Sequence, residues 1–346
     1  MRIKPKYIIG LLVYLGLLWL AETFLRDFHL RLLIQFGLTA IVATGVNLTN
    51  GYTNIFSLGF GGTMLVAGYT TALLTLPVKY KEQFLDLPVW LEQLNVPFPM
   101  AMLVAGTLGM LASIVLLLPA FRLRGQYFIL ASIGINIVME NIAENMRWLT
   151  HGNLGIRTIP QYTNIWWVFG ILAVTVYCLH QLMKSRHGRA LQVISKDQEL
   201  AGVMGINVVR YKVLSFAVGS FISSIGAALW CHQILIINPK AFSLIYVFQL
   251  VAMIAIGGTG TLSGPIIGTA ILMIGTEFLT PLQEGFSLFG LSVPPVFGAI
   301  NVFIAIMLIL VMIFRPRGVL NGKEIWQCRP AWLCSKKPDA AGESQS

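Results

Sequence analysis

Polar side chains interrupt several long apolar stretches of this 346-residue chain, and they are the residues best placed to do chemistry. An amide or carboxyl group in the hydrocarbon of a bilayer is costly, so it must face protein or water. Such groups can line a path for a polar solute, or they can hydrogen-bond to neighbouring helices and hold a bundle together. The candidates for a path are Asn47, Asn50, Ser57, Asn136, Glu140 and Gln249. The two readings carry equal weight for Asn47 and Gln249, whereas the position of Glu140 near the end of its stretch favours a vestibule or a partner contact.

The sequence carries no motif for enzymatic chemistry. The glycine-rich segment 257–264 reads GGTGTLSG, but no Lys-Ser or Lys-Thr pair follows at the spacing of a nucleotide-binding loop. No HExxH, GxSxG or paired Cys/His spacing occurs, and the five histidines fall near the ends of apolar stretches or in polar segments. We therefore expect no enzymatic activity, no metal site and no cofactor bound by this chain, and we expect the histidines to be interfacial or solvated.

The composition indicates the class of protein that must position these groups. Hydrophobic residues make up 56% of the chain and charged residues only 11%, whereas a soluble domain is about 25% charged. Long apolar blocks between short polar breaks are typical of an all-α polytopic membrane protein. About ten blocks approach the ~20 residues that a transmembrane helix needs. They cover 7–25, 31–49, 58–76, 98–119, 125–147, 162–182, 213–235, 241–258, 264–283 and 297–314.

Two glycine-rich segments, near 50–60 and 257–265, predict helices that are broken inside the membrane. Threonine, serine and glycine positions in 53–63 recur at the same spacing in 259–269. This recurrence is consistent with a parallel structural repeat, and it is equally consistent with coincidence in a glycine-rich membrane sequence.

Lysine and arginine are distributed unevenly between the polar segments. If the N-terminus is cytosolic, the inner segments hold most of the basic residues, and the bias agrees with the positive-inside rule. We therefore expect both termini and the segment 184–212 in the cytosol, so the net charge of +10 indicates topology rather than nucleic-acid binding. Residues 1–322 form one predicted transmembrane domain, and the polar residues 323–346 form a predicted flexible cytosolic tail.

The segment 184–212 is the longest polar interval, and it contains its own helix signal. Ser195 followed by Gln198 is typical of a capping box that starts a helix. Asp197 and Glu199 then suit the positive end of that helix, and Gly205 is placed to end it.

One side of this short helix is apolar, because Leu200, Val203 and Met204 fall together. The helix is too short to cross a bilayer. We therefore expect the apolar side to meet another protein.

Five segments resemble the permease subunits of branched-chain amino acid ABC importers, in particular the LivM type. They are NLTNGYTNIFSLGFGGTMLVAGYTTALL (47–74), FRLRGQYFILASIGI (121–135), GRALQVISKDQELAGVMGINVVRYKVLSFAVGS (188–220), AIGGTGTLSGPIIGTAIL (255–272) and FRPRGVL (314–320). The resemblance spans most of residues 30–320, whereas 79–98 and the tail match nothing in the family.

The resemblance implies that this chain works as one subunit of a larger transporter. A LivM-type subunit pairs with a LivH-type permease, two cytosolic ATPases that use ATP, and an extracytoplasmic solute-binding protein, in the cytoplasmic membrane of a bacterium or archaeon. The segment 196–205 would be the coupling helix that docks on an ATPase, with leucine in place of the first alanine of the family's E-A-A-x-x-x-G pattern. The residues implied in this contact are Arg189, Ser195, Asp197, Glu199, Leu200, Ala201, Met204 and Gly205.

Other functions are compatible with the same pattern of spans. The cargo of this architecture includes urea, short amides and other amino acids. An ion-coupled secondary transporter would need a deeply placed carboxylate, for which Glu140 is the candidate. A membrane scaffold that moves no solute would tolerate mutation of Asn47 or Gln249.

Overall fold

The computed structural model describes residues 14, 16, 18–84, 88–123, 125–284, 287–288, 291–292, 298–315 and 318–320. The predicted tail 323–346 and residues 7–13, 15 and 17 of the first apolar block, 7–25, lie outside these residues. Residues 18–24 at the end of that block are helical.

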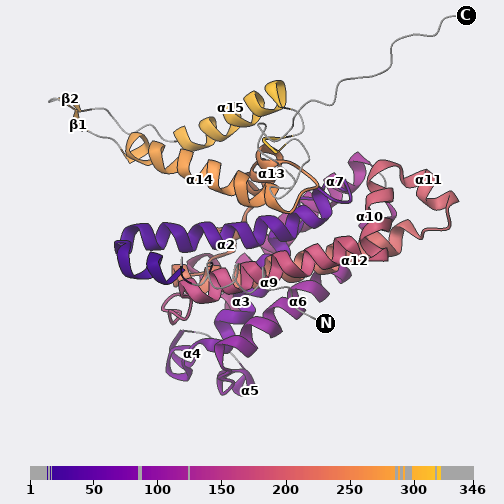
Figure 1. The fold of residues 1–346 in the computed structure, drawn as a ribbon. Coiled ribbons are helices and arrows are strands. Elements are labelled where there is room, and N and C mark those ends of the chain that lie inside the picture. Colours follow the sequence, from indigo (N-terminus) through magenta and orange to yellow (C-terminus); the bar gives the residue numbers. More distant parts are fainter. Residues whose placement is uncertain are drawn as a thin grey trace, which may run out of the picture.

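In the described part of the chain, the regular secondary structure is helical apart from one pair of two-residue strands and one isolated bridge (Figure 1). The long helices are α2 (Asp27–Asn50), α3 (Phe60–Thr75), α6 (Phe98–Leu117), α7 (Gln126–Asn145), α9 (Ile165–Lys184), α12 (Val208–Ile234), α13 (Leu244–Gly257), α14 (Ser263–Glu284) and α15 (Ala299–Phe314). The short helices are α4 (Val78–Phe84), α5 (Val89–Glu92), α8 (Arg147–Thr150), α10 (Arg186–Lys196) and α11 (Gln198–Val203). The 3₁₀ turns are η1 (Ala120–Arg122), η2 (Gly152–Leu154) and η3 (Pro239–Phe242), and β1 (Ser287–Leu288) pairs with β2 (Leu291–Ser292).

Each of the nine later apolar blocks coincides with one long helix, so the prediction of a polytopic helical membrane protein is confirmed. Within the described residues, seven helices are long and apolar enough to cross a membrane. α3 and α15 have 16 residues each, which is shorter than the usual span. The count of ten spans and the placement of the termini therefore stay predictions.

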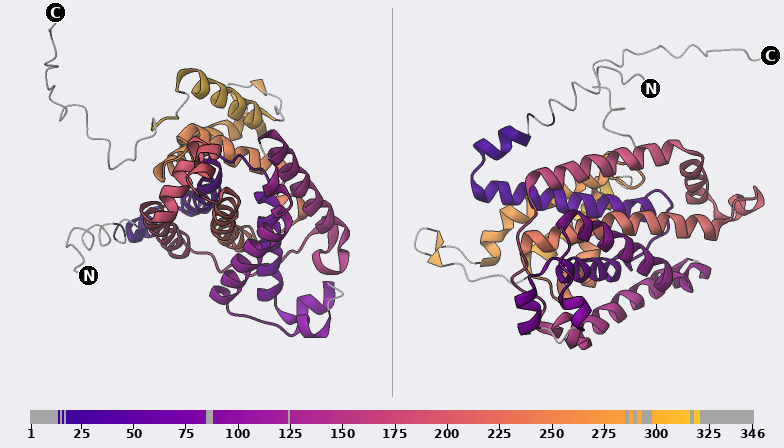
Figure 2. Two further views of the ribbon diagram at one scale, coloured as in Figure 1. Left: turned by 90° about the vertical axis from the view of Figure 1, so that its right-hand side faces the viewer. Right: turned by 90° about the horizontal axis from the view of Figure 1, so that it is seen from below.

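The helix α12 lies at the centre of the bundle and packs against α2, α3 and α6. Small residues allow this close approach: a Cβ atom on Gly45 would lie 2.7 Å from the carbonyl oxygen of Gly219. The short helices α10 and α11 project from one end of the bundle, and α4 and α5 lie at the other (Figure 1). Several long helices are seen nearly end-on in the left view of Figure 2.

Non-helical segments occupy both places where breaks were predicted: residues 51–59 separate α2 from α3, and residues 258–262 separate α13 from α14. They meet inside the bundle, where Asn47 Nδ2 donates a hydrogen bond of 2.8 Å to the Thr261 carbonyl oxygen. Residues after α15 return to the same place, because the Val319 amide donates to the Ile256 carbonyl oxygen at 2.9 Å. Gly318 has a φ of +75° there, and a Cβ on it would collide with Gly258. The glycine of the FRPRG segment is therefore required by this contact.

The loop between α7 and α9 is ordered by the chain that follows α12. Ile156 and Ile237 exchange two backbone hydrogen bonds of 2.9 and 3.0 Å. His232 adds a 2.8 Å contact from Nδ1 to the Pro160 carbonyl oxygen. These contacts fix the loop against the end of α12.

Candidate functional site

The short helix α11 starts two residues later than the capping-box interpretation predicts. Ser195 lies inside α10, where its Oγ donates to the Gln192 carbonyl oxygen at 2.8 Å. Asp197 is the residue that caps α11, since its Oδ1 accepts from the amides of Glu199 and Leu200 at 2.8 and 3.1 Å. The prediction that Ser195 is the cap was therefore wrong. The physical reason is that α10 continues through Lys196, which places the Ser195 hydroxyl beside its own helix.

The end of α11 is as predicted. Gly205 has a φ of +79°, its amide donates to the Gly202 carbonyl oxygen at 3.0 Å, and the Ile206 amide donates to that of Ala201 at 3.0 Å. This pair of bonds is the Schellman arrangement, which uses a left-handed residue after the helix. An aspartate cap at one end and a glycine at the other thus define a short helix whose faces have fixed directions.

The apolar side of α11 points away from the rest of the described chain. Leu200 is 56% exposed, Val203 is 87% exposed and Met204 is 64% exposed, whereas Ala201 is fully buried against the bundle. Arg189 is exposed on the neighbouring α10. We call Leu200, Val203 and Met204 the apolar triad.

A groove of about 770 Å³ lies beside this helix. It is bounded by η1, α11 and the start of α12, and charged side chains line it together with apolar ones. The lining residues are Phe121, Arg122, Gln198, Glu199, Gly202, Val203, Val208, Val209 and Lys212. The groove and the apolar triad together form a surface on which another protein could seat an amphipathic element.

The polar residues predicted for a path divide into two groups. Asn50 and Ser57 bond to each other across the first break: Asn50 Nδ2 donates to the Ser57 carbonyl oxygen at 3.1 Å, and Asn50 Oδ1 accepts from the Ser57 amide at 3.0 Å. Asn47 bonds the second break, as described above. These three residues are at most 5% exposed and stabilise the breaks.

Asn136 differs from them. It is 1% exposed, yet neither its Oδ1 nor its Nδ2 has a hydrogen-bond partner in the described part of the chain. Gln249 and Glu140 are half-buried on α13 and α7. The structure therefore does not bring the six predicted residues into one site.

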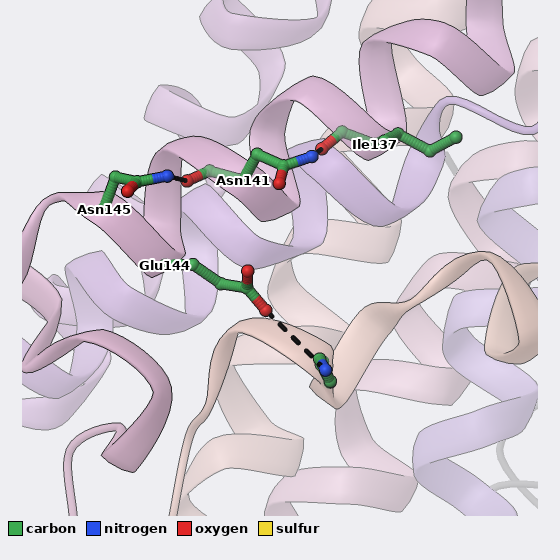
Figure 3. A network of polar contacts seen from close by, with 5 residues as sticks. Ile137, Asn141, Glu144 and Asn145 are labelled. Atoms are coloured by element: carbon green, nitrogen blue, oxygen red, sulfur yellow. Dashed lines mark hydrogen bonds and ion pairs between the residues drawn. The ribbon is translucent and has the colours of Figure 1, made fainter.

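The C-terminal half of α7 carries a second set of polar side chains (Figure 3). Glu144 Oε1 lies 3.8 Å from the Lys240 ammonium of η3. Asn141 and Asn145 are exposed, and each donates to a carbonyl oxygen of its own helix, four residues back, at 2.8 Å. Asn136 and Asn141 are therefore on different sides of α7, one buried and one exposed.

Two buried polar residues had no functional prediction from the sequence. His232 is fully buried, with Nδ1 near Pro160 and Nε2 3.3 Å from Thr75 Oγ1, so its reading as an interfacial or solvated residue was wrong. Lys81 is also buried, and its ammonium donates to the carbonyl oxygens of Leu91 and Leu94 at 3.3 and 2.5 Å. Burial lowers the pKa of Lys81 from its ordinary value of 10.5. Neither residue belongs to a motif that spacing alone could identify.

Comparison with known proteins decides the family. Residues 28–314 match the family described as "Branched-chain amino acid transport system / permease component". The chain belongs to this family. It is thus a multi-pass membrane protein of a family of transport permeases, and the resemblance of the five segments is confirmed.

Individual relatives carry the names of two kinds of subunit. The chain is 21% identical to the high-affinity branched-chain amino acid transport system permease protein LivM of Salmonella typhimurium, over 81% of this chain and 67% of that protein. It is 22% identical to the probable LivM permease of Methanocaldococcus jannaschii, over 86% of this chain and 95% of the relative. It is also 22% identical to LivH of Escherichia coli, over 83% of this chain and 92% of LivH. Relatives of this chain thus include permease proteins of both names, LivM and LivH.

Proposed function

We propose that this chain is a permease subunit of an ATP-driven importer that moves branched-chain amino acids, or a similar small polar solute, into the cytoplasm. The chain itself binds no cofactor and hydrolyses nothing; partner ATPases use the ATP. Its further partners are a second permease of the LivH type and an extracytoplasmic solute-binding protein. The membrane is the cytoplasmic membrane of a bacterium or archaeon, with both termini of this chain in the cytosol.

The observation that carries the proposal is the exposure of the apolar triad on a helix capped at both ends. Apolar side chains that are exposed together on one face favour contact with a partner protein. A short helix that presents such a face fits a groove on another chain, with residues three and four apart as anchors. An ATPase subunit is the partner that a permease without a nucleotide-binding loop needs.

The coupling follows from the connections of α11. It is joined to α10 and α9 on one side and to α12 on the other. Movement of a docked ATPase would therefore act on α9 and α12 together, and a rigid-body shift of these helices is a recognised route from one access state to another. Arg189 and Lys196 lie close to α11 along the chain and are exposed. We expect them to steer the ATPase to this end of the bundle.

Leu200→Asp tests this contact in the complete transporter reconstituted in proteoliposomes. A buried, unpaired carboxylate at the interface should abolish both uptake and transport-coupled ATP hydrolysis. Gln192→Asp, which adds the same charge on the exposed side of α10, is the matched control and should keep both activities. Normal uptake by Leu200→Asp would show that α11 is not the coupling helix.

The cargo requires a separate measurement. Calorimetry on the solute-binding protein of the same transporter should show binding of leucine, isoleucine or valine. Binding of urea or a short amide instead would assign this chain to a urea or amide importer with the same architecture. Uptake that persists without the ATPases and collapses with an uncoupler would assign it to ion-coupled transport.

A further inference from the structure

Two helices begin close to each other inside the bundle. α3 starts at Phe60 after the first break, and α13 starts at Leu244 after η3, which returns toward the bundle interior from the end of α12. Neither Gly59 nor Ser243, the residues that precede these helices, supplies a side-chain cap. A Cβ atom on Gly61 would collide with the carbonyl oxygen of Phe242, so the first turn of α3 contacts the end of η3, two residues before α13 begins.

Asn136 of α7 lies at this junction. A Cβ atom on Gly61 would lie 2.5 Å from its Oδ1 and 2.8 Å from its Nδ2, so the amide rests directly against the first turn of α3. Both polar atoms are buried, and neither has a partner in the described residues. A buried amide without partners costs stability, and such a group in a folded protein calls for a functional explanation.

The chemistry of the junction suits a zwitterion. Two helix N-termini carry partial positive charge and free amides, which favour a carboxylate. Nδ2 of Asn136 can donate to the same carboxylate, while its Oδ1 and the Phe242 carbonyl oxygen can accept from an adjacent ammonium group. An α-amino acid carries these two charges on neighbouring atoms.

An apolar crevice lies near the junction, farther along the same two helices. It has a volume of about 160 Å³ and lies between α3 and α7, starting one helical turn beyond Gly62 and Asn136. Aliphatic and thioether side chains form most of its wall, and Tyr69 and two threonines contribute the rest. The lining residues are Leu65, Val66, Tyr69, Thr70, Leu73, Met139, Ile142, Ala143, Met146, Leu149 and Thr150. The crevice has room for a small branched side chain.

We propose that the junction of Gly61, Asn136 and Phe242 binds the head group of an α-amino acid, and that the crevice between α3 and α7 receives its branched side chain. This site is closed here, because Asn136 touches Gly61, and it opens when α7 moves away from α3. The inference rests on the proposed transport function and adds to it a substrate site within this chain. Selection by a branched side chain would then occur in the permease as well as in the binding protein.

Uptake kinetics in the reconstituted transporter test the head-group contact. Asn136→Ala should lower the uptake of leucine by about 10- to 100-fold, the effect of losing a hydrogen bond to a charged group. Asn136→Asp should lower it further, since it places a second carboxylate beside that of the substrate. Asn141→Ala, which removes an exposed amide from the same helix, is the control and should stay within about twofold of wild type.

Thermal unfolding separates this role from a structural one. Removal of an amide without partners should leave the unfolding temperature of Asn136→Ala unchanged or higher. A fall in that temperature matching the loss of uptake would overturn the proposal, as would uptake equal to that of Asn141→Ala. Failure of the wild-type transporter to move any α-amino acid would overturn the proposed function as well.

A second measurement tests the crevice without changing Asn136. Val66→Cys, in a chain whose four native cysteines are alanine, should react with a maleimide, since Val66 is half-exposed in the crevice wall. L-Leucine should slow this reaction in the complete transporter, and leucinamide, which has no carboxylate, should slow it much less. Equal labelling rates with and without leucine would overturn the proposal.

Discussion

Asn47 of α2 donates a 2.8 Å hydrogen bond from Nδ2 to the carbonyl oxygen of Thr261, 214 residues later in the chain. The bond joins the two segments at which helices are interrupted. Backbone groups in such interruptions lack the partners that a continuous helix supplies, so a side chain must supply them. The Asn47 side-chain amide therefore links the two breaks across the bundle.

Asn47→Leu should lower the free energy of unfolding by about 1 kcal/mol, because a hydrogen bond is lost and the Thr261 carbonyl oxygen stays buried. The measurement is thermal unfolding of the detergent-purified protein. Asn141→Leu is the control, since the Asn141 amide is exposed and bonds only to its own helix. Equal unfolding temperatures for the two variants would contradict the assignment.

Gly268→Ala should destabilise the protein by about 1 to 3 kcal/mol, the usual cost of overpacking. A Cβ atom at this position would collide with the Met253 carbonyl oxygen of α13. Gly134→Ala should instead stabilise the protein by up to about 1 kcal/mol. No atom lies within 4 Å of a Cβ built at this position, and alanine is the better helix former. Thermal unfolding of both variants checks the pair, and a loss of stability in both would argue against close packing as the cause.

Asp197→Ala should weaken coupling more than Ser195→Ala does. The aspartate cap is worth about 1 kcal/mol to α11, whereas Ser195 bonds only inside α10. Faster hydrogen exchange at the amides of Glu199 and Leu200, together with reduced transport-coupled ATP hydrolysis, is the expected result. Asp197→Asn keeps the cap and should behave like wild type; a larger effect of Ser195→Ala would restore the capping-box interpretation.

The segment that contains Lys81 should become more stable as the pH rises. Burial lowers the pKa of Lys81 below 10.5, so the folded state releases the proton at lower pH than the unfolded state does. Between the lowered value and 10.5 the unfolded state binds more protons, and the free energy of unfolding of this segment therefore rises with pH. Hydrogen exchange at the amides of α4 and α5 measures this free energy of unfolding. Lys81→Met should make the protection nearly independent of pH. A fall in the wild-type protection as the pH rises would contradict the prediction.

The bundle could be predicted largely from the sequence, because lipid requires long apolar helices and glycine marks the positions where they break. The course of α11 was predicted to within a turn, yet its cap was misplaced. Both Ser195 and Asp197 have the chemistry of a cap, and only the length of α10 decides between them. Local sequence does not fix that length.

The candidate substrate site was harder to predict. Asn136 and Asn141 are the same residue type on one helix, and both lie in an apolar stretch. Only the orientation of α7 about its own axis distinguishes them. In that orientation, Asn136 and Met139 of α7 contact Gly61 and Gly62 of α3. His232 was missed for a related reason: it lies near the end of its helix, but the loop at Pro160 folds back over it. Such contacts between distant segments have no signature in the local sequence.

The helix α12 is one uninterrupted rod of 27 residues, which gives it a length of about 40 Å. Its first residues follow α11 directly, and near its far end His232 holds the loop at Pro160. A tilt of about 5° around its midpoint displaces each end by roughly 2 Å, as for any rigid rod of that length. The middle of α12 packs against α2, where Gly45 meets Gly219, so a displacement at the α11 end of this helix arrives at its His232 end with its direction reversed.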